Sequence, residues 1–393
     1  MRSLPFLGLS LLPPLVLSDC VLRRFQSAHV QGYDPQQCSR LLGLERTVRG
    51  PREFVEPFSE TGDLRRLNEI PSCPPYFMVC EETEPRCRSF SSGGDHGVLI
   101  DYMGYRIRDR PGEIFVDVGG NRGFFSLYAA NLGLCTIYFE IQKYFLGNVA
   151  FSALANGVED RFFIFQQGVS RSSSSMTFKH FDGVAHLAEG GEGDTMVPVE
   201  PLDSVIQQPV AMLKIDVEGF EMCALEGAQR LVFEHGASFM AFEIGPARWS
   251  RCGTTLAEGT ELMQRVSEHY DSFVSAHCRE SFKVGEYLEK ETRSFPGDRW
   301  DRFELYKVPR GAWPQLIAEM AEKDADCNFW FEHKEAAAKT GEGVPSGHKW
   351  PGAYSSTSSK TILAVVMVSV GIGFLLYLCA CRKVAGTLRR RRM

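Results

Sequence analysis

The clearest pattern of apolar and polar positions in this chain lies between residues 113 and 140. An apolar run, Ile114 to Val116, leads into Asp117 and a glycine-rich turn. A helix-like segment follows, and a second apolar run, Cys135 to Phe139, ends in Glu140. The pattern predicts strand, tight turn, helix and strand, with one carboxylate at the end of each strand. Such a βαβ unit binds ligands at the carboxyl ends of its strands.

A second stretch, near the middle of the chain, has a similar organisation. The apolar run Met212 to Val217 predicts a strand with Lys214 and Asp216 on one face, because side chains alternate along a strand. Glu218 and Gly219 then turn the chain into a helix whose apolar positions recur at spacings of three and four. Charges at the end of a buried strand are costly unless they have partners or a task.

The rest of the pattern adds more strands and helices. Strands are expected at Phe162–Phe165, Phe239–Phe242 and Phe303–Val308, helices at Phe145–Ala155 and after the capping box Thr255–Glu258, and a hairpin or lead-in strands at Val98–Arg108. Asp203 is expected to cap the helix that follows it. Strands that alternate with helices predict an α/β fold.

The turn after the first strand indicates the ligand chemistry. Its spacing, Asp-x-Gly-x-x-x-Gly from Asp117 to Gly123, differs from the dinucleotide motif G-x-G-x-x-G, and the sequence has no G-x-x-x-x-G-K-[ST] phosphate loop. A carboxylate at the head of the turn suits a cationic ligand, the glycines leave room for it, and Glu140 can accept both hydroxyls of a ribose. S-adenosylmethionine fits, since it has a ribose, a sulfonium and an ammonium and no phosphate. The alternative is an ordinary turn of any doubly wound fold.

Several motifs resemble those of the FkbM-type S-adenosylmethionine-dependent methyltransferases. They are Val116-Asp117-Val118-Gly119, Phe139-Glu140, Asn148 with Asn156, Leu202-Asp203-Ser204 and, most specific, Lys214-Ile215-Asp216-Val217-Glu218-Gly219. The resemblance spans about residues 98–245. Two positions depart from it: Gly120 stands where the family more often has Ala, and Ile141 where it commonly has Pro. The resemblance implies a Rossmann-like class I methyltransferase sheet with helices on both faces.

Candidate cofactor residues follow from the turn and the strand ends. We expect Asp117, Gly119, Asn121, Gly123 and Glu140 to bind S-adenosylmethionine. The resemblance adds Gly168, within the segment 167–169 that would approach the adenine edge after the third strand. For the glycines the alternative is simple turn geometry, and for Asp117 it is a helix cap or turn carboxylate.

Candidate acceptor-side residues come from the neighbouring strand ends, namely Lys214, Asp216, Glu218 and Glu243. Our hypothesis is that Asp216 or Glu243 orients the acceptor or takes its proton, while Lys214 holds the group together by charge. The competing interpretation is a structural pair between Lys214 and a carboxylate. No spacing demands a metal, and His235, His277 and His333 do not have ligand spacing, so none is expected.

Composition and charge exclude one class of partner. The 393 residues are 44% hydrophobic and 23% charged, as in globular proteins, with a net charge of −6. Residues 382–393 carry six positive charges, so the remainder has a net charge of −12. An acidic body lacks the electrostatic footprint of a nucleic-acid enzyme, so we expect no nucleic-acid partner.

The two ends of the chain predict a membrane topology. Residues 1–18 resemble a signal peptide, and residues 361–381 have no charge over a length of roughly 30 Å, enough to span a bilayer. The basic segment 382–393 then lies in the cytosol and the enzyme on the lumenal or extracytoplasmic side. Between them we expect a cysteine-containing extension at 19–95, the methyltransferase domain at 96–310, and a helix and stalk at 311–360. The alternative is a tail-anchored protein that faces the cytosol.

Cysteines of the extension give no zinc pattern. Cys20, Cys38, Cys73, Cys80 and Cys87 contain no C-x-x-C pair, and the last three would join disulfides in the lumen or stay free thiols in the cytosol. Taken together, the sequence predicts a membrane-anchored methyltransferase acting on a hydroxyl of a glycan, glycolipid or other small molecule. Two alternatives remain open: a catalytically silent membrane-tethered scaffold, and a cytosolic tail-anchored methyltransferase acting on lipid or protein.

Overall fold

The computed structural model describes residues 65–70, 76–81, 100, 102–104, 106–108, 110–181, 184–188, 195–293 and 303–335. All of them belong to the unit formed by Met1–Pro296 and Trp300–Lys349. The predicted signal peptide, stalk, membrane span and basic tail lie outside the described residues. Within the described ranges, no helix combines the length and the apolar character needed to cross a membrane.

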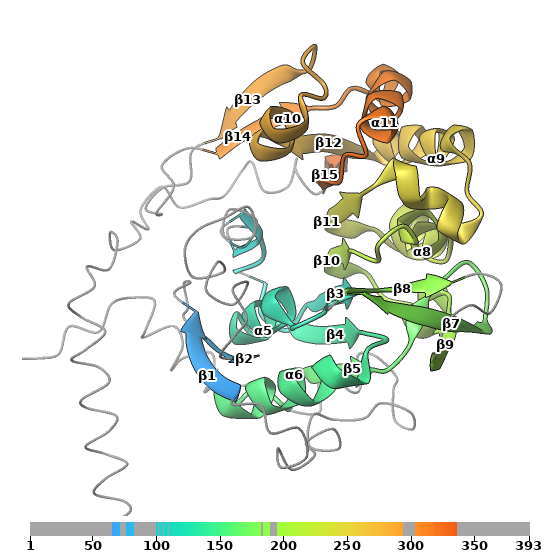
Figure 1. Ribbon diagram of the computed structural model, residues 1–393. Helices are drawn as coiled ribbons and strands as arrows, with labels where there is room; N and C mark the ends of the chain where they lie inside the picture. Colours follow the sequence, from blue (N-terminus) through green and yellow to red (C-terminus); the bar gives the residue numbers. More distant parts are fainter. Residues whose placement is uncertain are drawn as a thin grey trace, which may run out of the picture. The chain divides into compact units, whose positions relative to one another are not determined.

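A nine-stranded mixed sheet organises the described part of the chain (Figure 1). In spatial order its strands are β13 (Glu289–Arg293), β14 (Phe303–Lys307), β12 (Tyr270–Ser275), β15 (Cys327–His333), β11 (Ala237–Ile244), β10 (Val210–Ile215), β3 (Ile114–Val118), β4 (Cys135–Phe139) and β5 (Phe162–Phe165). The five strands from β11 to β5 are parallel, and β15 runs antiparallel to both β11 and β12. The strand order reverses beside β3, which places the ligand-binding edge at the carboxyl ends of β3 and β10.

Helices cover both faces of this sheet, as the sequence predicts. One apolar cluster contains Phe115 with residues of α5 (Phe124–Asn131) and α6 (Lys143–Asn156). The other contains Val116, the next residue of β3, with residues of α8, η2, η3, α9, α10 and α11. These are Glu221–Glu226, Leu231–His235, Pro246–Cys252, Leu256–His269, Ala276–Phe282 and Trp313–Glu322, and two further short helices are α7 (Leu202–Val205) and η4 (Arg310–Ala312). Alternation along β3 thus divides the core into two layers, which confirms the α/β, Rossmann-like fold.

Two smaller sheets were not expected from the sequence. One has the order β6-β9-β7-β8 and is formed by Gly168–Val169, Thr195–Glu200, Ser174–Phe181 and Val184–Ala188. The other pairs β1 (Arg65–Ile70) with β2 (Tyr76–Glu81). The Val79 amide donates to the Ser152 hydroxyl of α6 at 2.9 Å, and the Tyr76 hydroxyl to the Phe124 carbonyl at 2.9 Å. Part of the predicted extension therefore packs on the catalytic domain.

Two sequence expectations are wrong. The described residues 102–104 and 106–107 are helical and do not form a hairpin. Tyr102, Met103 and Ile107 are buried in one apolar cluster, where Tyr102 packs edge-on against Trp330. The domain boundary expected at residue 310 is also too early. β15 lies inside the sheet between β11 and β12, so the domain extends at least to residue 333.

Candidate active site

The glycine-rich turn connects β3 to α5 and is set by backbone packing. Gly119 and Gly123 have φ of 76° and 75°, and Asn121 has φ of 48°. A Cβ on Gly119 would lie 1.8 Å from the carbonyl oxygen of Asp216, and one on Gly123 would lie 2.8 Å from Val149. The added atoms would meet the protein itself, so turn geometry explains these two glycines. The expectation that they leave room for a ligand is not what their packing shows.

Glu140 lies where β4 ends and contacts this turn directly. Its Oε2 accepts a hydrogen bond from the Asn121 amide at 2.8 Å, and its Oε1 accepts one from the Gln142 amide at 2.8 Å. The side chain is buried, and this burial raises the pKa of Glu140 to about 7 despite the hydrogen bonds that favour its ionised form. The Tyr138 hydroxyl donates to the Asn121 carbonyl and holds the turn from the other side. The structure thus brings together two predicted cofactor residues, Asn121 and Glu140.

A buried lysine links the two strand ends at the centre of the sheet. Lys214 of β10 lies in register with Asp117 of β3, and its Nζ is 3.4 Å from Asp117 Oδ1 and 3.2 Å from Asp216 Oδ2. Asp117 has no exposed surface, and its Oδ2 accepts a hydrogen bond from the Ser126 hydroxyl at 2.6 Å. Burial opposes the charge of Lys214, but the carboxylates of Asp216 and Asp117 outweigh it and raise the lysine pKa.

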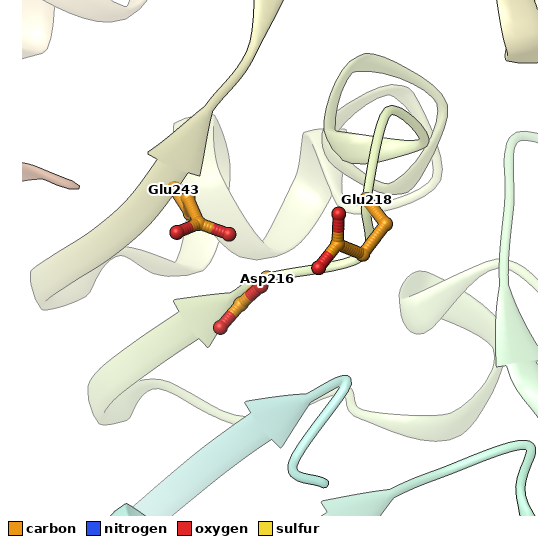
Figure 2. Close-up of side chains that lie close together, drawn as sticks. All are labelled: Asp216, Glu218 and Glu243. Atoms are coloured by element: carbon orange, nitrogen blue, oxygen red, sulfur yellow. The ribbon is translucent and has the colours of Figure 1, made fainter. Parts of the chain in front are cut away.

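Three carboxylates converge at the ends of neighbouring strands (Figure 2). Asp216 follows β10, Glu218 lies in the turn before α8, and Glu243 lies near the end of β11, with one oxygen of each within 4.8 Å of the others. The charge of Asp216, followed by burial, raises the pKa of Glu243 well above its ordinary value. The predicted acceptor-side residues are therefore neighbours. An acidic cluster does not by itself make a metal site, and here Lys214 and Arg248 offset part of its charge.

Three further residues of this region were missed by the sequence analysis. Arg248 of η3 lies 2.9 Å from Glu218 and also forms an ion pair with Asp326, the residue before β15. Glu221, at the start of α8, accepts a hydrogen bond from the Gly219 amide at 2.7 Å and is buried. Glu221 lies two residues after the motif Lys214 to Gly219, so the sequence could have indicated it. Asp326 is brought close only by the pairing of β15 with β11.

Two other predicted residues lie elsewhere. Gly168 opens β6, where it pairs with Val199 in the four-stranded sheet, so its contact with the cofactor stays a prediction. Asp203 does not cap the helix that contains it. Its carboxylate accepts hydrogen bonds from the amides of Arg230 and Leu231 at 2.8 and 2.9 Å, and so caps the start of η2 instead.

Comparison with known proteins agrees with this architecture at the level of the family. Residues 117–271 match the family model described as Methyltransferase FkbM domain. No curated protein matches the chain. Among solved structures, a methyltransferase FkbM from Methylobacillus flagellatus KT is similar at 20% identity over 50% of this chain and 44% of that chain, with a TM-score of 0.30.

Two other solved structures are similar at lower identity. A precorrin-6y C5,15-methyltransferase from Geobacter metallireducens GS-15 is 12% identical over 61% of this chain and 88% of that chain, with a TM-score of 0.30. A SAM-dependent O-methyltransferase from Thermotoga maritima is 12% identical over 60% of this chain and 64% of that chain, with a TM-score of 0.29. The chain spans less than half the length of the Methylobacillus protein. On the family match, this chain carries a methyltransferase FkbM domain at residues 117–271.

Proposed function

We propose that this chain is an S-adenosylmethionine-dependent methyltransferase that methylates a hydroxyl of a glycan, glycolipid or other small molecule. The observation that carries the proposal is the position of Glu140 within the family domain. It lies at the carboxyl end of β4, beside the end of β3, with each oxygen already oriented by a backbone amide. An ionised carboxylate only accepts hydrogen bonds, so Glu140 at this place suits the hydroxyl donors of a ribose.

The residues present fit this cofactor. S-adenosylmethionine, when bound, supplies a methyl group on a cationic sulfonium. Glu140 would hold the ribose, and Asn121 fixes the turn against which the cofactor would lie. Asp117, which has no exposed surface, would act through its charge and through Lys214 rather than by direct contact. The excess of carboxylates over cations at the strand ends favours a positively charged ligand.

On the acceptor side, Asp216 and Glu243 would take up the hydroxyl proton. The acceptor oxygen forms a bond to the methyl carbon, the carbon–sulfur bond breaks, and the proton passes to the carboxylate pair. The charge of Asp216, followed by burial, raises the pKa of Glu243, which makes the Glu243 carboxylate a stronger base than an isolated one. Lys214 keeps Asp216 in place through an ion pair, with Nζ 3.2 Å from Asp216 Oδ2.

We also propose that the enzyme is anchored in a membrane of the secretory pathway by residues 361–381, with its catalytic domain in the lumen or outside the cell. Disulfides Cys223–Cys252 and Cys278–Cys327, with Cα atoms 6.2 and 5.5 Å apart, support this side of the membrane, because disulfides persist in oxidising compartments. Protease protection in sealed vesicles tests the topology. Digestion of the catalytic domain in intact vesicles would instead support the cytosolic, tail-anchored alternative.

Calorimetric titration of S-adenosylmethionine into the full-length chain in detergent tests the cofactor. We expect micromolar binding that is lost in Glu140→Ala and retained in Glu261→Ala, a matched change on the exposed face of α9. Such a result would turn the search to acceptors, glycans first. No binding by a well-folded wild type would refute the proposal and favour a membrane-tethered scaffold.

A further inference from the structure

The short helix η3 lies against the turn that carries Glu218. Arg251 donates from Nη1 to the Glu218 carbonyl at 2.6 Å. A Cβ on Gly219 would lie 2.7 Å from the carbonyl oxygen of Arg248 and 2.8 Å from its Cβ. Only glycine at this position lets the two segments come so close. The turn and η3 therefore form one packed unit.

Glu218 is held in an unusual backbone conformation within this unit. Its φ is 53° and that of Gly219 is 102°, both in the left-handed region. A non-glycine residue rarely adopts such a φ unless its surroundings require it. Here three hydrogen bonds fix the turn. Arg251 donates to the Glu218 carbonyl, Arg248 donates to the Glu218 carboxylate, and the Gly219 amide donates to the Glu221 carboxylate. The conformation turns the Glu218 carboxylate toward Asp216 and Glu243.

Arg248 connects Glu218 to a residue outside the family domain. Its Nη1 lies 2.9 Å from Glu218 Oε2 and is ion-paired with Asp326. The Arg248, Glu218 and Asp326 side chains are 27%, 25% and 22% exposed, so they sit at the rim of the cluster where an acceptor can reach them. By contrast, the Lys214 side chain, which lies deeper in the protein, is only 6% exposed. Asp326 lies well past residue 271, where the family match ends.

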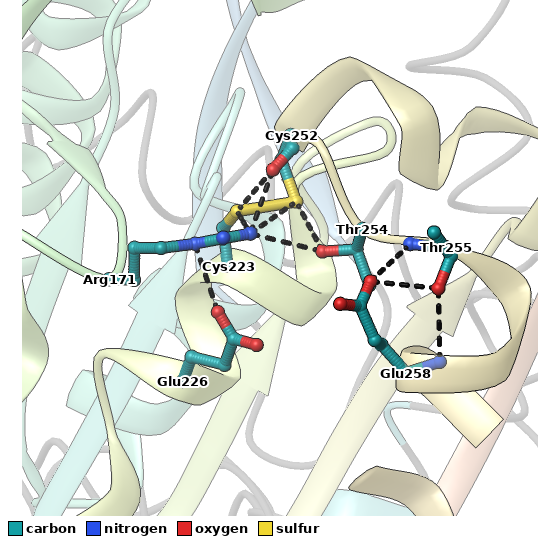
Figure 3. Close-up of polar contacts among 7 residues, drawn as sticks. All are labelled: Arg171, Cys223, Glu226, Cys252, Thr254, Thr255 and Glu258. Atoms are coloured by element: carbon teal, nitrogen blue, oxygen red, sulfur yellow. Dashed lines mark hydrogen bonds and ion pairs between the residues drawn. A yellow bond between two sulfur atoms is a disulfide. The ribbon is translucent and has the colours of Figure 1, made fainter. Parts of the chain in front are cut away.

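The far end of η3 is fixed independently (Figure 3). Cys252, its last residue, is disulfide-bonded to Cys223 of α8. Arg171 donates from Nη2 to the Cys252 carbonyl at 2.7 Å and to the Thr254 hydroxyl at 3.1 Å, and its Nε lies 2.9 Å from Glu226. Because η3 is attached at its end to α8, Arg248 is presented to Glu218 from a fixed support.

We propose that Arg248 is a positioning residue of the acceptor side, which holds the Glu218 carboxylate in place, and that Asp326 in turn holds Arg248. The inference rests on the proposed function for its catalytic meaning. The charged groups that face Glu218 are Asp216 and Glu243 from the strand ends, Asp326 from the β15 side, and Arg248 and Arg251 from η3. Carboxylates thus outnumber cations around Glu218, and Arg248 is its one ion-pair partner among the described residues.

Removing the Arg248 charge has a defined consequence. Burial and the charge of Asp216 raise the pKa of Glu218, and Arg248 opposes them. Without the guanidinium the carboxyl would hold its proton to higher pH, and the side chain would lose the contact that fixes its direction. An arginine that does not pair with Glu218 would leave the Glu218 titration unchanged, and turnover at unchanged cofactor affinity tests whether the pair serves the acceptor side.

Titration of full-length protein labelled with [5-13C]glutamate tests the inference. Loss of one carboxyl resonance in Glu218→Gln assigns the signal. We expect its midpoint to rise by about one pH unit in Arg248→Gln, and to stay near the wild-type value in Arg248→Lys, which keeps the charge. Arg310→Gln, which removes an exposed arginine paired with Glu268, should leave it unchanged. An unchanged midpoint in Arg248→Gln overturns the proposal, as does an equal shift in the Arg310 variant.

Binding and turnover separate this inference from the proposed function. S-adenosylmethionine affinity should be the same in wild type and Arg248→Gln, while release of S-adenosylhomocysteine with an active acceptor should fall on the order of tenfold and recover in Arg248→Lys. A wild type that binds no cofactor would refute the proposed function alone, because the Glu218 titration still tests whether Arg248 holds the Glu218 carboxylate.

Discussion

Binding of S-adenosylmethionine should depend on pH through Glu140. The two amide donors orient its oxygens at 2.8 Å, but burial raises the pKa of Glu140 to about 7. Only the ionised carboxylate can accept both ribose hydroxyls, because protonation turns one oxygen into a donor. Binding therefore strengthens as pH rises through about 7, and bound cofactor lowers the pKa of Glu140.

The size of the effect follows from the ionised fraction. With a pKa of about 7, roughly one tenth of the free protein is competent at pH 6 and nearly all of it at pH 8. The apparent dissociation constant scales inversely with the competent fraction, so affinity should be about tenfold weaker at pH 6 than at pH 8. Binding near pH 6 should also release a proton from Glu140.

Calorimetry between about pH 5.5 and 8.5, in buffers of different ionisation enthalpy, measures both quantities. The α-amino group of the ligand titrates near pH 8, so a matched control is needed. Glu140→Gln provides it, because the amide keeps the size of the side chain and cannot ionise. We expect this variant to bind S-adenosylmethionine more weakly than the wild type, with an affinity that does not change with pH in the acidic part of the range. If the affinities of wild type and Glu140→Gln change in parallel with pH, Glu140 is not the titrating group and the reasoning fails.

Three further outcomes concern the fold around the site. Burial raises the pKa of Glu221 to about 8 in the folded protein. The free energy of unfolding of the wild type should therefore fall, relative to that of Glu221→Gln, by about 1.4 kcal/mol for each pH unit between pH 5 and 8. Urea unfolding measures this, and a difference between the two proteins that stays constant with pH would contradict it. Gly119→Ala should cost more than about 2 kcal/mol, whereas Gly157→Ala, also left-handed but in open space, should cost about 1 kcal/mol. Peptide mapping without reductant should recover the Cys223–Cys252 disulfide, and free thiols at both positions would contradict this. Replacing both cysteines by serine should lower the free energy of unfolding by about 3 kcal/mol.

Local pattern was enough to predict the strands and the helix around the candidate site. The apolar runs correctly gave β3 and β4 with a helix between them, and period-two alternation correctly put Lys214 and Asp216 on one side of β10. The capping box at Thr255 is also confirmed. In each case the residues that interact are close in sequence or belong to adjacent parallel strands, so strand periodicity and turn residues carry the information.

The remaining parts of the site depend on pairings over long stretches of chain. β15 enters the sheet between β11 and β12, and this insertion brings Asp326 to Arg248. Nothing in the local sequence of either residue predicts the partner. The helical turns at 102–104 and 106–107 show the same limit, because their apolar spacing fits a strand as well as a helix until Tyr102 meets Trp330.

The two interpretations of Lys214 are compatible in this structure, and only one variant separates them. Lys214 pairs with Asp117, which is fully buried, so a neutral residue at 214 would leave an uncompensated charge and damage the fold whatever its catalytic role. Asp216, at 29% exposure, is different, because Asp216→Asn leaves the Lys214–Asp117 pair in place. A catalytic Asp216 predicts normal cofactor affinity and slower methyl transfer in that variant. Normal affinity with normal turnover would leave Asp216 as a structural partner of Lys214.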